Sequence, residues 1–213
     1  ANKVALQREM NLPVKPKTPL FGTITRLVEQ KGTSIELGAL EEMLNADIQF
    51  VLLGSGVANY EHAFQNLSKR FSEKAAARIG YDQGLSHRIE AGCDFYLMPS
   101  RFEPCGLNQM YSLRYGTIPI VRTTGGLVDT VVAASTNLRK ATGIKFAAYS
   151  APALAKAIRK SLVIYQNAKL LQLYRRNGMT ADFSWNRTVA EYEKVYASTV
   201  HSRISCRKRC EKV

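Results

Sequence analysis

The sequence predicts an α/β domain built on a doubly wound parallel sheet, with helices on both faces. Two observations lead to this prediction. Short apolar runs recur without the polar alternation of a half-exposed strand, and helical spacing of apolar residues follows each run. The chain has 213 residues, of which 46% are hydrophobic and 22% charged, and this fits one globular domain with short flanks.

Six apolar or β-prone runs are the expected strands. They cover residues 20–25, 49–53, 76–81, 94–98, 117–121 and 143–146. Turn-forming residues close two of them, because Gly54 and Gly56 follow the second run and Pro99 follows the fourth.

Seven segments between and after these strands are expected to be helical. They cover residues 32–44, 58–73, 86–92, 107–115, 151–165, 169–178 and 186–200. In the first of them, Leu37, Leu40 and Leu44 recur at helical spacing. Parallel sheets of this kind bind ligands beyond the carboxyl ends of their strands, so the loops there are the places to look for function.

The loop after the first strand, residues 25–32, places two cations beside the start of a helix. Arg26 and Lys31 lie close to free N–H groups that already favour an anion. Two cations in this position can hold a diphosphate. The spacing alone leaves two solvated surface charges as the alternative. The glycine pattern of a P-loop is absent.

The loop after the fourth strand, residues 99–109, combines a carboxylate with a potential anion site. Glu103 is flanked by residues that cannot neutralise it, and the backbone N–H groups at 106–108 are unpaired where the next helix begins. This combination suits a substrate with a hydroxyl-rich part and a phosphate part. The alternative interpretation is an acid that caps its own helix.

Two further loops carry weaker signals. Tyr81 follows Gly80 at the end of the third strand, where its ring can offer a stacking face to a nucleobase. Gly125 and Gly126 follow the fifth strand and allow a backbone to approach a ligand closely. Ordinary packing of the tyrosine and a plain glycine turn are the alternatives.

The charge balance and the apolar runs narrow the possible partners. Thirty Lys and Arg against 17 Asp and Glu give a net charge of +13, which favours nucleic acid, an acidic surface or a phosphorylated small molecule. Basic residues are neither clustered in the body nor interleaved with aromatic residues, and we therefore expect no nucleic-acid partner. No apolar run approaches the roughly 18 residues of a membrane span, and residues 1–4 do not resemble a signal peptide.

The cysteine and histidine spacing predicts neither a disulfide framework nor a metal site. Cys93 and Cys105 lack metal-ligand spacing, Cys206 and Cys210 form a C-x3-C in the basic tail, and the sequence shows no His/Cys cluster for zinc. There is no Asp-x-Asp motif either. We therefore expect no metal, no cofactor and an intracellular compartment.

Three regions are expected along the chain. Residues 1–19 form an entry segment that ends in a proline-rich linker, residues 20–200 form the α/β domain, and residues 201–213 form a basic tail. The tail holds five Lys and Arg against one Glu, a net charge of +4. The chain also begins without Met, which is typical of a processed or excised piece.

Longer motifs resemble the C-terminal half of the bacterial glycogen synthase and plant starch synthase family. They are PSRFEPCGLNQMY at 99–111, YGTIPIVR at 115–122 and TGGLVDTV at 124–131, with shorter matches at 26–32, 79–81, 86–89 and 182–185. The resemblance covers roughly residues 1–200 and leaves out the tail.

This resemblance implies two facing Rossmann-like domains, the GT-B arrangement, of which the C-terminal one holds a nucleotide sugar. It implies retaining transfer of glucose from ADP-glucose to the non-reducing end of an α-1,4-glucan. Arg26 and Lys31 would hold the diphosphate and stabilise the departing ADP, while Glu103 would bind the glucose hydroxyls. The implied donor-binding residues are Tyr81 against adenine and Cys105, Gly106, Leu107, Asn108, Thr124 and Gly125 around sugar and phosphate.

The sequence departs from the family in two respects. Related retaining transferases carry a second Glu eight residues after the first, where this chain has Tyr111. The N-terminal domain, with its Lys-x-Gly-Gly-Leu loop and its glucan-acceptor surface, is not in the sequence. We therefore expect a donor-binding half that is inactive alone, located in a bacterial cytoplasm or in a plastid. The alternative is a non-catalytic module that binds a nucleotide sugar or a glucan.

Overall fold

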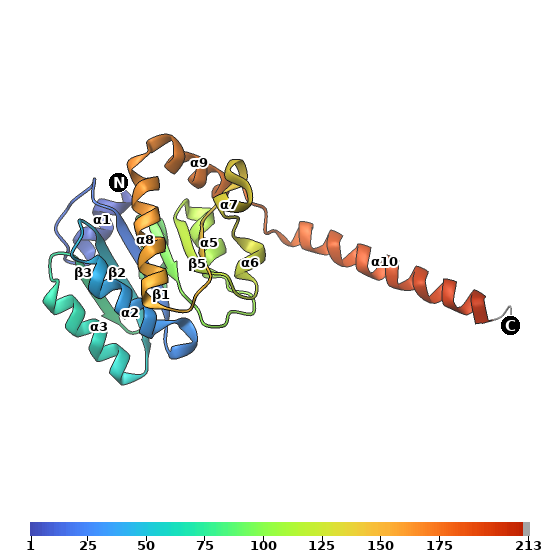
Figure 1. Cartoon of the computed structure of the whole chain (residues 1–213), viewed down its shortest axis with the longest axis horizontal. Coiled ribbons are helices and arrows are strands. Elements are labelled where there is room, and N and C mark those ends of the chain that lie inside the picture. Colours follow the sequence, from blue (N-terminus) through green and yellow to red (C-terminus); the bar gives the residue numbers. More distant parts are fainter. Residues whose placement is uncertain (211–213) are drawn as a thin grey trace. The chain divides into compact units, whose positions relative to one another are not determined.

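The computed structural model describes the backbone of residues 1–210 and the side chains of residues 1–200. The chain divides into two units, residues 1–180 and residues 181–213. The first unit contains a six-stranded sheet (Figure 1), and the second is essentially one helix, α10 (Trp185–Cys210). The side chains of the predicted basic tail, residues 201–213, lie outside the described residues.

All six strands of the sheet are parallel, and their order is β3-β2-β1-β4-β5-β6. Their bounds are β1 (Leu20–Leu27), β2 (Gln49–Gly56), β3 (Ala75–Ile79), β4 (Phe95–Met98), β5 (Ile118–Arg122) and β6 (Ile144–Phe146). Each expected strand is present, so the predicted doubly wound α/β fold is confirmed. The third strand ends at Ile79 rather than Tyr81, because Gly80 takes a positive φ of 136° and turns the chain out of the sheet.

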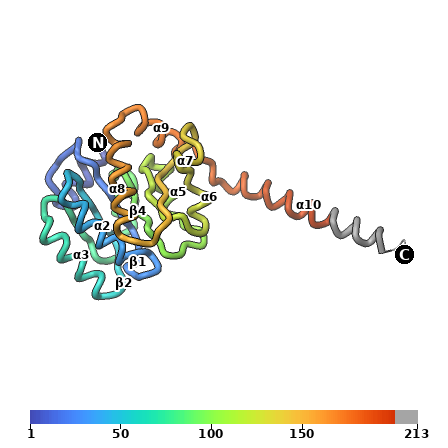
Figure 2. The backbone as a smooth tube through the Cα atoms, in the orientation of Figure 1, coloured from blue at the N-terminus to red at the C-terminus, as the bar shows by residue number. Residues whose placement is uncertain are grey.

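Helices connect the strands, as Figure 2 lets the reader follow along the tube. They are α1 (Asn2–Glu9), α2 (Thr33–Met43), α3 (Ala58–Arg70), α4 (Gln83–Gly92), α5 (Asn108–Tyr115), α6 (Leu127–Thr130), α7 (Ala134–Asn137), α8 (Ala151–Gln166) and α9 (Ala168–Met179). Two single 3-10 turns, η1 (Glu29–Lys31) and η2 (Leu138–Lys140), add to these. The sequence did not predict α1, α6 or α7.

The core lies on both faces of the sheet because successive strand residues point to opposite sides. In β2, Phe50 and Leu52 pack with α2, α3 and α8 on one face. Val51 and Leu53 pack with α1 and α4 on the other. Four consecutive buried residues of one strand therefore contribute alternately to the two hydrophobic cores, as expected for a parallel sheet covered by helices on both faces.

The first nineteen residues pack onto this unit. Leu6 of α1 is buried against α4, and the Gln7 side chain donates hydrogen bonds to Lys15 O at 3.1 Å and to Gln49 Oε1 at 2.6 Å. The expected division of the chain at residues 19/20 and 200/201 stays a prediction, while the contacts separate 1–180 from 181–213.

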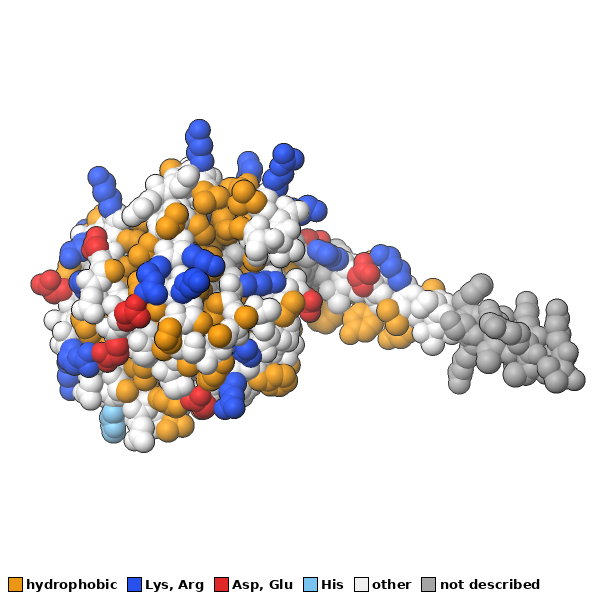
Figure 3. Space-filling view, viewed as in Figure 1, with side chains coloured by type: hydrophobic (Ala, Val, Ile, Leu, Met, Phe, Trp, Pro, Cys, Tyr) orange, Lys and Arg blue, Asp and Glu red, His pale blue; other side chains and the backbone are white. Residues whose placement is uncertain are grey.

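Helix α10 carries an apolar stripe of its own. Val189, Tyr192, Val195 and Tyr196 are all exposed, and Figure 3 shows hydrophobic side chains gathered along one side of this helix. The prediction that residues 186–200 form a helix is confirmed.

The topology creates a crevice at one place. The chain moves outward from β1 through β2 to β3 and then returns to β4 on the other side of β1. The loops after β1 and β4 consequently diverge at the carboxyl edge of the sheet, where open α/β sheets bind their ligands.

A buried carboxyl group lies beneath this crevice. Glu36 of α2 is fully buried, and its Oε1 accepts a hydrogen bond from the Thr23 hydroxyl on β1. Its other oxygen, Oε2, has no partner among the described residues. Burial raises the pKa of Glu36 from 4.5 to about 8, so the folded chain keeps a proton there at neutral pH.

We expect this proton to make the fold less stable as the pH rises. The unfolded chain loses it near pH 4.5 and the folded chain only near pH 8, so the free energy of unfolding should fall between those values. One such group contributes a slope of about 1.4 kcal/mol per pH unit.

Urea unfolding between pH 5 and pH 8 measures this dependence, and the free energy of unfolding should fall less steeply with pH in Glu36→Gln. Glu73→Gln, at an exposed position, should keep the original slope, and an unchanged slope in Glu36→Gln would contradict the expectation.

Candidate functional site

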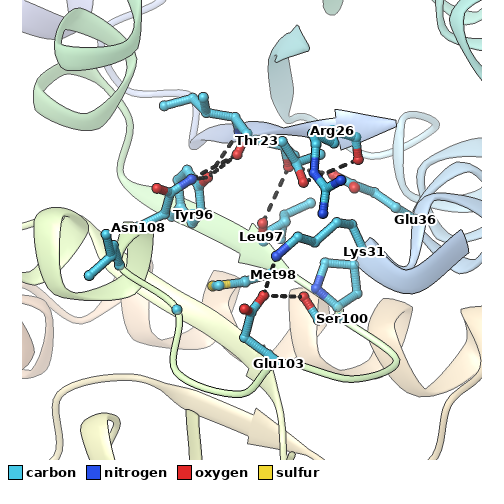
Figure 4. Close-up of a pocket in the computed structure, with 15 residues that line it drawn as sticks. Thr23, Arg26, Lys31, Glu36, Tyr96, Leu97, Met98, Ser100, Glu103 and Asn108 are labelled. Carbon is cyan, nitrogen blue, oxygen red and sulfur yellow. Dashed lines mark hydrogen bonds and ion pairs between the residues drawn. The ribbon is translucent and has the colours of Figure 1, made fainter. Parts of the chain in front are cut away.

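Two neighbouring cavities open at the carboxyl edge of the sheet. The first, which we call the Glu103 cavity, has a volume of about 350 Å³ and is drawn in Figure 4. The second, the Tyr81 cavity, has a volume of about 420 Å³. The two share the lining residues Ile24, Thr25, Arg26 and Asn108. An elongated ligand can therefore occupy both.

An ion pair lies in the Glu103 cavity. The Lys31 ammonium is 2.5 Å from Oε2 of Glu103, and the Ser100 hydroxyl donates to the same oxygen at 3.2 Å. Only 20% of the Lys31 side chain and 7% of the Glu103 side chain are exposed. The two predicted residues from different loops thus meet. The alternative that Glu103 caps its own helix is wrong, because no side chain caps the start of α5.

Two glycines make this meeting possible. Gly32 has φ = +79°, and a Cβ there would lie 2.1 Å from the Pro99 carbonyl oxygen. Gly125 has φ = +45°, and a Cβ there would lie 1.9 Å from the carbonyl oxygen of Glu103. The backbone of the Glu103 loop is therefore held between two close approaches that a side chain would prevent.

Three predicted donor-binding residues stand outside both cavities. Thr124 and Gly125 belong to the loop that packs behind the Glu103 backbone, where the Gly126 N–H donates to Glu103 O at 3.1 Å. Cys105 is exposed and is also absent from the two linings. Donor contacts by these residues stay predictions.

Arg26 is a cation without a counter-ion in the described chain. It is exposed at the end of β1, lines both cavities, and its guanidinium forms no ion pair or hydrogen bond with any described residue. Because Lys31 is already paired and Arg26 is not, Arg26 offers the more available positive charge to an incoming anion.

The start of α5 adds uncharged donors. Gly106, with φ = +77°, and Leu107 both line the Glu103 cavity, and among the described residues nothing accepts a hydrogen bond from their N–H groups. The Asn108 side chain, by contrast, already forms hydrogen bonds within the protein. Its Nδ2 donates to Ile24 O at 2.8 Å and to the Tyr96 hydroxyl at 2.7 Å, so it ties α5 to β1 and β4.

Tyr96 is a site residue that the sequence did not reveal. Its buried hydroxyl donates to Ile24 O at 2.7 Å and accepts from Ile24 N at 3.0 Å. It thereby fixes the end of β1 next to Arg26. In the sequence, Tyr96 looks like any other member of a buried apolar strand.

Arg122 of β5 anchors the Glu103 loop. Its guanidinium donates to Ser100 O at 2.8 Å, to Arg101 O, and to Ala147 O at 3.3 Å. The same group lies over the Tyr149 ring, 5.7 Å from its centroid. One side chain therefore holds two successive carbonyls just before Glu103.

A second set of contacts ties the two loops to each other. The Arg101 N–H donates to Gln30 O at 2.8 Å, and the Gln30 side chain donates to Phe102 O at 3.3 Å. The neighbouring Glu29 accepts from the hydroxyls of Tyr60 at 2.6 Å and Tyr149 at 2.7 Å. These bonds, that of Tyr60 first, keep the pKa of Glu29 below its ordinary value.

The Tyr81 cavity is lined by a different set of side chains. Tyr81 is 89% exposed at its edge, directly after Gly80. Helices α4 and α5 also contribute to its lining, with His87 and Glu90 from α4 and Tyr111 from α5. A planar ring with a free face is compatible with the predicted stacking on a base, which stays a prediction.

Within the described residues, no three His, Cys, Asp or Glu side chains are grouped as they would be around a metal ion. In the same part of the chain, none of the helices combines the length and apolar character needed to cross a membrane.

Comparison with known proteins gives a consistent result. The family model of glycosyl transferases group 1 matches residues 8–178. The chain is 50% identical over 203 residues to a glycogen synthase of Anaeromyxobacter dehalogenans, covering 95% of this chain but 42% of that protein. A second strain of that species has a glycogen synthase with 51% identity over 196 residues, 92% of this chain and 41% of that protein.

A solved structure shows the same similarity in three dimensions. The catalytic domain of starch synthase IV from Arabidopsis thaliana, bound to ADP and acarbose, superimposes with a TM-score of 0.84 at 35% identity. The match covers 94% of this chain and 42% of that one. The chain therefore spans less than half the length of these relatives.

The anchoring of the Glu103 loop can be tested by hydrogen exchange. Lysine carries a point charge and cannot bridge three carbonyl oxygens as the Arg122 guanidinium does. In Arg122→Lys we expect the Arg101 amide to exchange about tenfold faster, because the loop loses hydrogen bonds worth about 1–2 kcal/mol. Arg78→Lys, an exposed change on the edge strand β3, is the matched control. Equal exchange of the Arg101 amide in both variants would show that Arg122 does not hold the loop.

Proposed function

The chain belongs to the glycosyl transferases group 1, and we propose that it is the donor-binding half of a glucan synthase. The proposed enzyme transfers glucose from ADP-glucose to the non-reducing end of an α-1,4-glucan, with retention of anomeric configuration. The predicted similarity to the C-terminal half of glycogen and starch synthases is confirmed by the relatives described above.

The Lys31–Glu103 pair beside the unpaired Arg26 is the observation that carries this proposal. A sugar nucleotide needs positive charge for its diphosphate and hydrogen-bond acceptors for its sugar hydroxyls. The Glu103 cavity supplies both within one volume of about 350 Å³. The open N–H groups of Gly106 and Leu107 add donors for phosphate or sugar oxygens.

Each group has a distinct role in the proposed reaction. Breaking the bond between glucose C1 and the diphosphate oxygen leaves negative charge on ADP. Arg26, Lys31 and the amides at the start of α5 stabilise that charge. Lys31, through its pair with Glu103, and the amides hold their positions before the donor arrives. Glu103 binds glucose hydroxyls and keeps Lys31 directed at the junction of sugar and diphosphate.

Two relations to other molecules complete the proposal. The glucan acceptor binds to an N-terminal domain that faces this one across the cleft, as in two-domain transferases. Closure of that cleft excludes water, which strengthens the charge interactions with the diphosphate. We place the reaction in a bacterial cytoplasm or in a plastid.

Binding of ADP to this chain tests the separate roles of the two charges. We expect Arg26→Ala to weaken ADP binding at least about tenfold, because a charge-assisted contact is worth about 1.5–3 kcal/mol. Glu103→Gln should leave ADP affinity unchanged or raise it, because ADP lacks the sugar and Lys31 is released from its counter-ion. Calorimetry at low ionic strength measures both, with Arg78→Ala as control. A loss in Glu103→Gln as large as that in Arg26→Ala would assign Glu103 to loop structure.

Transfer activity separates the proposed enzyme half from the alternative, a non-catalytic binding module. Residues 1–200 can replace the matching segment of the Anaeromyxobacter glycogen synthase, which is 50% identical. We expect this chimera to transfer labelled glucose from ADP-glucose to glycogen and the Glu103→Gln chimera to lose nearly all transfer. The isolated chain should transfer none. A folded chimera that binds ADP but transfers nothing would favour the binding module, and turnover by the chain alone would show that no second domain is needed.

A further inference from the structure

A second buried carboxyl group lies at the inner wall of the Tyr81 cavity. Glu90 of α4 is only 3% exposed, yet it lines this cavity together with His87 and Tyr111. Its Oε2 accepts a hydrogen bond from the Ser112 hydroxyl at 2.5 Å. Its Oε1 receives no hydrogen bond from the described residues, so half of the carboxyl group is left for a ligand.

The protonation of Glu90 restricts which ligand group can bind there. Burial raises the pKa of Glu90 to about 8, so near neutral pH both the acid and the carboxylate are accessible within a small pH range. With Ser112 donating to Oε2, Oε1 donates when the group is protonated and accepts when it is ionised. A hydroxyl group suits both states because it can donate and accept, whereas an amino group suits only the ionised state.

The position of Glu90 along the cavities agrees with a sugar hydroxyl. Arg26 lines both cavities and so marks the place of the diphosphate, while Tyr81 lies exposed at the edge of its cavity and offers a face for the base. In a nucleoside diphosphate the ribose comes between these two parts. A ribose that follows a phosphate at Arg26 enters the Tyr81 cavity, whose inner wall contains Glu90.

We propose that Glu90 is a binding residue for the ribose of the nucleotide donor, with Oε1 bonded to a 2′- or 3′-hydroxyl and Ser112 holding the carboxyl group in position. This inference rests on the proposed function, since it requires a nucleoside diphosphate in the two cavities. It assigns a role to a residue that lies 13 positions before Glu103, outside the loops that carry the charges.

Calorimetry with hydroxyl-deleted nucleotides tests the contact directly. We expect 2′-deoxy-ADP or 3′-deoxy-ADP to bind the unmodified chain about five- to tenfold more weakly than ADP, as expected when one buried hydrogen bond is lost. In Glu90→Met this difference should disappear, while Glu90→Gln, which keeps a polar group of the same shape, should retain most of it. Ser112→Ala should reduce the difference, because Oε1 is then less well positioned.

Two controls keep this result separate from the proposed function. Arg26→Ala should weaken binding of ADP and of both deoxy nucleotides by the same factor and leave the hydroxyl effect intact. Inosine diphosphate, which lacks the adenine amino group, reports on the base. If Glu90→Met changes discrimination against inosine diphosphate but not against the deoxy nucleotides, Glu90 contacts the base and the ribose assignment is wrong.

The remaining outcomes distinguish failure of the ribose assignment from failure of the proposed function. An equal hydroxyl effect in the unmodified chain and in Glu90→Met, with both proteins folded, overturns the inference while the proposed function stands. The same is true if no hydroxyl effect exists in the unmodified chain. If ADP does not bind at millimolar concentration, or binds without dependence on Arg26, the proposed function itself fails and the ribose contact fails with it.

Discussion

The site depends on one largely buried ion pair, between Lys31 and Glu103. Removing two charges from water is costly, and a pair of this kind persists only where the surrounding structure fixes both partners. Here the close approach of Gly32 to Pro99 fixes the first loop, and the bonds from Arg122 to the carbonyls of Ser100 and Arg101 fix the second. These contacts hold the two loops in place in the absence of a bound ligand.

This arrangement also explains why the topology matters for chemistry. The loops after β1 and β4 begin side by side because these strands are adjacent in the sheet, and they then diverge because the strand order reverses there, which opens the crevice. Tyr96 and Asn108 close the gap behind them by bonding to Ile24, so the two cavities share a rigid wall. A donor that spans both cavities would meet groups already in place, which lowers the entropy lost when it binds.

The sequence predicted the strands and the charged loops but not the polar groups under them. Apolar runs identify parallel strands because such strands are buried on both faces, and Arg26, Lys31 and Glu103 are conspicuous because they follow those runs. Glu90 was hidden because a single acid within a helical pattern is usually solvated, and its partner Ser112 lies 22 positions away. Glu36 of α2 was missed for the same reason, whereas Tyr96 was missed because it stands in a buried apolar strand. Helix α1 was missed because few of its eight residues are apolar.

The buried carboxyl group of Glu36 affects the charge that the Glu103 cavity presents. At neutral pH, Glu36 beneath the Glu103 cavity keeps its proton, so the cations Arg26 and Lys31 face one carboxylate, Glu103, and the cavity is positive on balance. Above about pH 8, Glu36 ionises and that balance becomes neutral. One added negative charge in the lining of this cavity weakens its attraction for an anion, because charge interactions are stronger in a partly buried site than in bulk water. Burying an acid without a counter-ion lowers the stability of the fold, and it also preserves the positive potential that the proposed binding of a diphosphate requires.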